Sequence, residues 1–167
     1  LTTEAIQFVE NSGEEPYFLW INYQDPHPAF CCPSPYDTMF DPSEIDVPER
    51  FYAYDSKSQP VKNEVFRVHS EMDQCTEDDL KKAIAHYMGQ IRYVDDNVGR
   101  LCDALKENGQ DKKTVILFFS DHGELLGDYR MTHKNPTFYE CLSHIPAILV
   151  HPDGRWKNTV FSGLTEE

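Results

Sequence analysis

Three short apolar runs interrupt a chain that is otherwise mixed in polarity, and they cover residues 17–23, 114–119 and 145–150. Each run is too short for a typical helix, is rich in β-branched or aromatic residues, and is bounded by turn-forming residues. A continuous apolar run of this kind predicts a strand that is buried on both faces. Such strands are typical of a parallel sheet.

A long helix is predicted between the first two runs, because apolar residues recur there at alternating spacings of three and four. Thr76 and Asp79 resemble a capping box at its start, and Asn108 with Gly109 supplies a left-handed stop at its end. A shorter helix is predicted from Thr3 to about Phe8. The apolar positions of the long helix are Leu80, Ile84, Tyr87, Ile91, Val94, Val98, Leu101 and Leu105.

The predicted order is helix, strand, long excursion, helix, strand, loop, strand, which indicates an α/β fold with a mostly parallel sheet flanked by helices. The excursion runs from Pro26 to about Asp79 and contains seven of the eleven prolines. A stretch of this length without clear elements usually lines a site or is mobile. The length of 167 residues fits one domain or a piece of one.

The charge of the chain excludes some classes of partner. Fifteen basic and 29 acidic residues give a net charge of −14, which repels nucleic acid and anionic membrane surfaces. An anionic substrate would need a local cluster of Lys, His or bound metal ion to reverse the sign. No stretch approaches the roughly 18 apolar residues of a membrane helix, so we expect neither a nucleic-acid partner nor a membrane span.

Candidate chemistry collects where the first two predicted strands end. The first run is followed by Asp25 and His27, and the second by Asp121, His122 and Gly123. The loops at the carboxyl ends of parallel strands converge, so these side chains are expected near one another. An adjacent carboxylate and imidazole can both turn toward one divalent cation. Alternatively, Asp121 caps a helix and His122 bonds a neighbouring carbonyl.

Three spaced motifs resemble the sulfatases of the alkaline phosphatase superfamily, in the order in which that family carries them. The first is Ser-Asp-His-Gly-Glu-Leu-Leu-Gly-Asp at 120–128, followed by Lys134 and Tyr139-Glu140. The others are the segments 16–28 and 93–101. The resemblance implies an alkaline-phosphatase-like sulfatase core. Residues 1–167 would form a central part of the catalytic domain, without its N-terminal nucleophile segment and its C-terminal part.

The resemblance also implies roles for individual residues. Asp121 and His122 would be two ligands of a divalent metal ion, Ca²⁺ in most sulfatases and Mn²⁺ or another ion in relatives. Lys134 would contact the sulfate and the leaving oxygen. His27 would donate to the same oxygens or protonate the leaving group. Taken singly, Lys134 reads equally well as a solvated surface residue, and His27 as a turn residue between two prolines.

The nucleophile of this family is a formylglycine made from Cys or Ser in a Cys/Ser-x-Pro-x-Arg motif. Cys31-Cys32-Pro33-Ser34-Pro35 imitates the motif, but Pro35 replaces the arginine. The motif should also precede the strand that leads to His27 by a long stretch. We therefore interpret Cys31 as a plain thiol and expect the formylglycine upstream of this chain. The paired Asp residues of the family's first strand are absent as well, so we expect no turnover by residues 1–167 alone.

The function that these residues predict is hydrolysis of a small-molecule or carbohydrate sulfate ester by a metal-dependent, formylglycine-type sulfatase. A phosphodiesterase or phosphonate monoester hydrolase of the same superfamily is the first alternative. The second is a catalytically inactive relative that binds a metal ion. The sequence does not decide which ester is used. The sequence also does not decide the cellular compartment of the protein, although a periplasmic or secreted location is common in the family.

Overall fold

The computed structural model describes residues 1–52, 65, 68 and 72–163, and this part of the chain divides into two compact units. The first unit comprises Leu1–Tyr23, Val94–Asp121 and Pro146–Glu167, and the second comprises Gln24–Tyr93 and His122–Ile145. Each unit is described by itself below. None of the helices in the described residues is both long and apolar enough to cross a membrane, as the sequence predicts.

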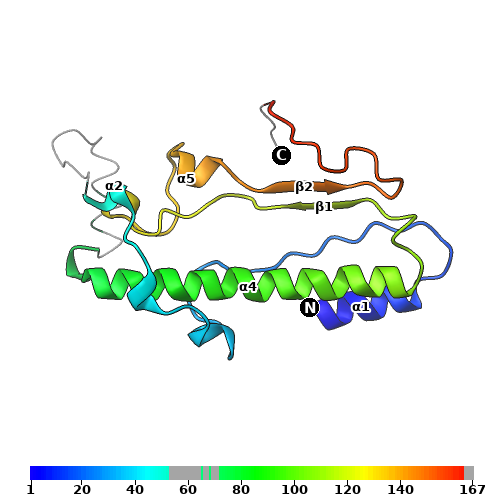
Figure 1. Ribbon diagram of the computed structural model, residues 1–167, viewed down its shortest axis with the longest axis horizontal. Helices are drawn as coiled ribbons and strands as arrows, with labels where there is room; N and C mark the ends of the chain where they lie inside the picture. The colour runs from blue at the N-terminus through cyan, green and yellow to red at the C-terminus, as the bar shows by residue number, and fades with distance from the viewer. Residues whose placement is uncertain (53–64, 66–67, 69–71, 164–167) are drawn as a thin grey trace. The chain divides into compact units, whose positions relative to one another are not determined.

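Both predicted helices are present (Figure 1). The short one is α1, Thr2–Asn11, and the long one is α4, Glu77–Glu107. The capping box of α4 forms as predicted, because Thr76 Oγ1 donates to Asp79 Oδ2 at 2.7 Å and the Asp79 amide donates back to Thr76 Oγ1 at 3.2 Å. Donation from the Thr76 hydroxyl, and then from the Thr76 amide at 3.1 Å, lowers the pKa of the Asp79 carboxyl. Gly109 ends the helical segment with a φ of +66°.

The sheet differs from the prediction. It consists of β1, Ile116–Phe119, and β2, Ala147–Val150, which pair antiparallel with Ile116 opposite Val150. The mostly parallel sheet is therefore not seen among the described residues. Nor are the strands buried on both faces: Leu117 is 61% exposed and Leu149 is 50% exposed. An apolar run favours a strand, but the direction of that strand depends on where the chain returns, which no local pattern encodes.

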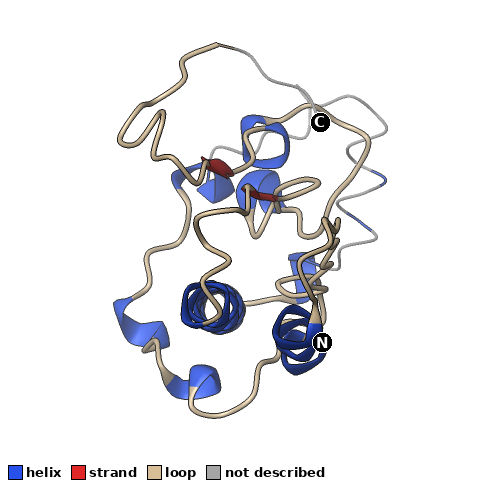
Figure 2. Ribbon diagram, turned by 90° about the vertical axis from the view of Figure 1, so that its right-hand side faces the viewer, coloured by secondary structure: helices blue, strands red, loops and turns tan. Residues whose placement is uncertain are grey.

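The remaining apolar run, residues 17–23, is extended but forms no strand. In the first unit its Trp20 ring meets the ring of Phe119 edge-on, with centroids 5.8 Å apart. Tyr17 donates its hydroxyl to Gln110 Oε1 at 2.7 Å, while Gln110 Nε2 donates to the Val9 carbonyl at 3.1 Å. One side chain thus ties the end of α1 to the residues after α4. Figures 1 and 2 show α1 beside the last turns of α4.

The second unit holds two buried apolar clusters joined to short helical turns. One consists of Phe51, Met72 and Leu80, and the other of Leu125, Met131 and Leu142. The predicted excursion contains η1, Tyr36–Thr38, η2, Pro42–Glu44, α2, Glu49–Tyr52, and η3, Met72–Gln74. The later loop contains η4, Asp128–Arg130, and α5, Glu140–Ser143. Residues 53–64, 66–67 and 69–71 of the excursion lie outside the described part.

Replacing Thr76 by Ala removes the hydroxyl that both donates to and accepts from Asp79. Loss of an N-terminal cap of this type destabilises a protein by about 1 kcal/mol. Chemical denaturation should show that decrease in the free energy of unfolding, with an unchanged dependence on denaturant concentration. Thr3→Ala, at an exposed position of α1, is the matched control and should change the free energy of unfolding by less than half as much.

Candidate active site

His122 and Lys134, two of the predicted site residues, lie in contact in the second unit. Lys134 Nζ lies 2.8 Å from His122 Nε2, and His122 Nδ1 lies 2.7 Å from the carbonyl oxygen of Gly123. A carbonyl can only accept, so Nδ1 carries the proton and Nε2 accepts from the ammonium. Lys134 is exposed and His122 half-buried, so a ligand from solvent can reach the pair.

The loop that carries these two residues folds back on itself. The Leu125 amide donates to the His133 carbonyl at 3.2 Å, and the Gly127 amide donates to the Met131 carbonyl at 2.8 Å. The two arms therefore run antiparallel, with His122 and Lys134 beyond the paired residues. Non-glycine residues in this loop have left-handed φ values between 39° and 65°, a strained conformation that clusters at functional sites. These residues are Leu126, Tyr129, Arg130 and His133.

Gly123 fixes the loop against α5. Its amide donates to the Leu142 carbonyl at 2.8 Å, and a Cβ atom at this position would lie only 1.9 Å from the carbonyl oxygen of Cys141. No side chain fits that distance, so the backbone of the residue after His122 can approach α5 only as glycine. The Gly123 carbonyl, which accepts from His122, is held by the same contact.

A partly buried salt bridge supports the far end of the loop. Arg50 of α2 donates to Asp128 Oδ2 at 3.3 Å, and the Asp128 side chain is only 10% exposed. Asp128 raises the pKa of Arg50. Burial, followed by the charge of Asp128, raises the pKa of the Cys141 thiol to about 11. Cys141 is therefore protonated at neutral pH and serves as packing, not as a nucleophile.

His27 lies on an exposed turn of the same unit. Its Nδ1 is 2.6 Å from the carbonyl oxygen of Pro28, so Nδ1 donates and Nε2 is the nitrogen left for exchange with a ligand. Phe30, three residues on, connects this turn to the loop of Lys134. Its ring stands edge-on to Tyr87 at 5.8 Å and lies 6.3 Å from the ring of His133. The structure thus brings the segments of His27 and Lys134 into contact.

Asp121 follows β1 and is exposed, and it is the last residue of its segment of the first unit. Within the described residues, no three His, Cys, Asp or Glu side chains gather in a way that could hold a metal ion. Both ring nitrogens of His122 already have hydrogen-bond contacts. Asp121 and His122 therefore do not complete a metal site within the described residues.

The sequence interpretation missed two residues that shape the site. In the sequence Gly123 is only the residue that follows His122, whereas the structure shows its close approach to α5. Gln90 is 1% exposed and holds the turn of His27 through Asp25 and Ala29. A signal for Gln90 was present: it lies three residues after Tyr87 and four before Val94, so it is a polar residue within the apolar stripe of the long helix.

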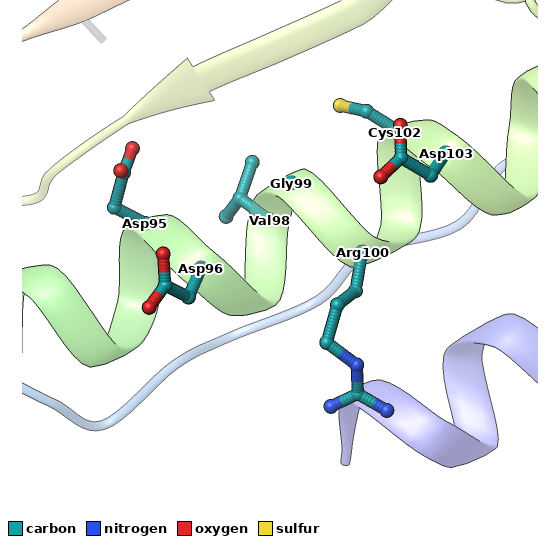
Figure 3. A pocket seen from close by; sticks show the side chains of 7 residues that line it. All are labelled: Asp95, Asp96, Val98, Gly99, Arg100, Cys102 and Asp103. Carbon is teal, nitrogen blue, oxygen red and sulfur yellow. The ribbon is translucent and has the colours of Figure 1, made fainter. Parts of the chain in front are cut away.

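Figure 3 shows a shallow hollow on α4 in the first unit, away from these residues in the sequence. All of its lining side chains come from Asp95–Asp103 of one helix. Asp95 and Arg100 extend to opposite sides of the helix in this view, and Arg100 donates to Asn97 Oδ1 at 3.0 Å. The segment 93–101, quoted above as one of the three motifs, is a structural part of the helix.

Comparison with known proteins gives a consistent set of matches. The family model named Sulfatase matches residues 1–162. The chain is 30% identical over 145 residues to the "Multifunctional alkaline phosphatase superfamily protein PehA" of Trinickia caryophylli, covering 80% of this chain and 28% of that protein. It is 28% identical over 153 residues to an arylsulfatase of Clostridium perfringens, covering 91% of this chain and 31% of that enzyme.

A solved structure agrees with the sequence matches. The phosphonate monoester hydrolase of Agrobacterium radiobacter superposes with a TM-score of 0.72 at 28% sequence identity, covering 91% of this chain and 32% of that one. The chain thus spans about a third of the length of the relatives it matches. The likeness supports the predicted partial core of this fold, although the described sheet contains only two strands.

Gly123→Ala should disrupt the site by forcing a methyl group against the Cys141 carbonyl. We expect a loss of roughly 1–3 kcal/mol in the free energy of unfolding and a weakened His122–Gly123 bond. The second effect is measured by ¹⁵N NMR of the imidazole as loss of the Nδ1–H tautomer. Gly13→Ala, where a Cβ meets nothing within 4 Å, should leave both measurements unchanged. An unaltered His122 tautomer in Gly123→Ala would contradict this role of the glycine.

Proposed function

Because the chain belongs to the sulfatase family, we propose that it supplies part of the active site of a sulfuric ester hydrolase. The observation that carries this proposal is the 2.8 Å contact between Lys134 Nζ and His122 Nε2. It places the Lys134 ammonium beside an imidazole nitrogen at the accessible end of the loop. The ammonium offers N–H donors to an oxyanion within a chain whose net charge is −14.

Lys134 has the central electrostatic role in this proposal. When a sulfate ester enters, the ammonium of Lys134 can leave His122 Nε2 and bind a sulfate oxygen without moving far. Its compact positive charge then offsets the negative charge that develops on the oxygens as the S–O bond breaks. His122 keeps its Nδ1 proton on the Gly123 carbonyl throughout, so the ring orientation does not change.

His27 has the role of proton donor in this proposal. Because Nδ1 donates to the Pro28 carbonyl, a proton taken up by the ring resides on Nε2. Transfer of that proton to the leaving oxygen returns the neutral Nδ1–H tautomer that the structure already contains. The step therefore requires no rotation of the ring and no change of its backbone hydrogen bond.

The nucleophile is proposed to come from outside residues 1–167. The sequence contains no Cys/Ser-x-Pro-x-Arg motif, and the chain spans about a third of its relatives. We accordingly propose that it is a central part of a larger catalytic domain whose formylglycine lies upstream. We also propose that Asp121 and His122 contribute two ligands to a divalent ion, Ca²⁺ or alternatively Mn²⁺, for which Lys134 would have to leave His122 Nε2. The remaining ligands would come from the same upstream part.

Phosphonate monoester hydrolysis is the second candidate function. It is favoured by the likeness to the phosphonate monoester hydrolase of Agrobacterium radiobacter, whose TM-score is 0.72. Lys134 and His27 would play the same parts, because a phosphonate monoester also presents anionic oxygens and a leaving oxygen. Rates of the complete enzyme on an aryl sulfate and an aryl phosphonate separate the two proposals. No turnover of either ester would favour an inactive relative.

Lys134→Ala in the complete enzyme should lower kcat/KM for an aryl sulfate by roughly 10²–10³-fold, because an electrostatic donor to the developing charge is lost. Lys134→Arg should recover only part of that loss, since a planar guanidinium does not reproduce a compact ammonium. Lys112→Ala, an exposed lysine of the first unit, is the matched control and should keep the wild-type rate. A rate in Lys134→Ala within threefold of wild type would overturn the role of this residue.

Asp121→Ala in the complete enzyme should reduce the bound divalent metal measured by elemental analysis after dialysis. Loss of a ligand is expected to weaken metal binding by at least 10–100-fold, the range seen even for residues that only support ligands. Asp103→Ala, an exposed aspartate of α4, should leave the metal content unchanged. Equal metal content in Asp121→Ala and wild type would refute the assignment of Asp121 as a ligand.

A further inference from the structure

We propose that Gln90 is a positioning residue, which fixes the nitrogen through which His27 exchanges its proton. The catalytic meaning of this role rests on the proposed function of His27, whereas the structural role can be measured without any turnover. Gln90 lies on α4 and is 1% exposed. It belongs to the second unit together with the whole segment from Asp25 to Phe30.

Gln90 holds the turn of His27 on both sides. Its Nε2 donates to Asp25 Oδ1 at 3.0 Å and to the Ala29 carbonyl oxygen at 3.4 Å. One amide group therefore binds the residue two before His27 and the residue two after it. Both partners are acceptors, so the amide must present its NH₂ group to the turn, which determines the orientation of the side chain.

The hydrogen bonds of Gln90 act on His27 through Pro28. The Pro28 carbonyl accepts the Nδ1 proton of His27 at 2.6 Å, and Ala29, the next residue, is the one that Gln90 binds. A carbonyl whose position is fixed selects the Nδ1–H tautomer and leaves Nε2 for exchange. If the turn is released, the carbonyl moves and both tautomers become accessible.

Burying the amide of Gln90 also lowers the stability of the fold, which argues that the amide is kept because it binds the turn of His27. Its Oε1 is buried and has no hydrogen-bond partner among the described residues. Leaving a buried acceptor unsatisfied is unfavourable, and an apolar side chain of similar length would avoid it. The apolar stripe to which Gln90 belongs would favour such a residue. A polar group kept at a cost to stability is typical of a functional site.

The helix surface next to Gln90 is shaped to receive the same segment of the chain. A Cβ atom at Gly89 would lie 2.3 Å from the carbonyl oxygen of Tyr36. The absence of a side chain therefore lets the backbone around Tyr36 lie directly on α4. The Cys32 thiol donates to the His86 carbonyl at 3.8 Å. Residues 86–90 thus bind the segment from Asp25 to Tyr36 at several points, of which Gln90 is the one that flanks His27.

The test is Gln90→Met, which keeps the length and the buried packing of the side chain but removes both donors. We expect ¹⁵N NMR of the chain to show His27 as the Nδ1–H tautomer in the wild type and as a mixture of both tautomers in Gln90→Met. His122 should keep its Nδ1–H tautomer in both proteins, since its bond to Gly123 does not involve Gln90. Gln90→Glu, which replaces the donors by a carboxylate facing Asp25, should release His27 at least as completely.

Gln110→Met is the matched control, because Gln110 is also an amide that donates to two partners, the Val9 carbonyl and Ser12 Oγ, but in the first unit. It should destabilise the protein without changing the His27 tautomer. An unchanged His27 tautomer in folded Gln90→Met, or an equal change in Gln110→Met, would overturn the proposal. If Gln90→Met and Gln90→Glu both fail to fold, Gln90 is a structural residue and the proposal also fails.

Titration of the wild-type chain with inorganic sulfate tests the proposed function separately. Sulfate should shift the NMR signals of His27 and His122 if these residues face an oxyanion. The absence of any shift would count against the sulfatase role of His27 while leaving the tautomer comparison intact. Conversely, shifts in both signals together with an unchanged tautomer in Gln90→Met would support the function and reject the role of Gln90.

Discussion

Close approach of one backbone segment to another is the constraint on which the candidate site depends. Gly123 lies so near the Cys141 carbonyl that a Cβ would fall 1.9 Å from its oxygen, and Gly89 lies similarly near the Tyr36 carbonyl at 2.3 Å. The first contact fixes the carbonyl that orients His122, and the second seats the segment that carries His27. The imidazoles of His122 and His27 each contact a main-chain oxygen, that of Gly123 and that of Pro28.

The electrostatics of the site are local and differ in sign from those of the whole chain. The net charge is −14, yet the accessible groups that converge in the second unit are an ammonium and a neutral imidazole. The nearby thiol of Cys141 stays uncharged because its pKa is about 11. An anion is therefore repelled at long range but finds donors at short range. Membership of the sulfatase family agrees with a site of this character.

The sheet shows where local patterns stop being informative. Residues 116–119 and 147–150 form strands within the runs that predicted them, but the strands pair antiparallel, and several of their apolar side chains are half exposed. A continuous apolar run is typical of a strand covered on both faces, whereas this chain spans only about a third of its relatives. The apolar pattern reflects the propensity of a segment to form a strand. The direction of the strand and the burial of its faces depend on chain segments far away in sequence.

The sequence by itself determined the two helices, the Thr76–Asp79 cap, the Gly109 stop and the chemical types of the candidate residues, because each depends on neighbours a few positions apart. It also contains His122 and Lys134 in one motif, but only the fold brings Lys134 Nζ to 2.8 Å from His122 Nε2. Only the tertiary structure decided which nitrogen of each imidazole carries the proton, why Gly123 cannot bear a side chain, and that Gln90 holds the turn of His27. These features depend on atoms from segments distant in sequence, whose approach is set by packing and cannot be read from local periodicity.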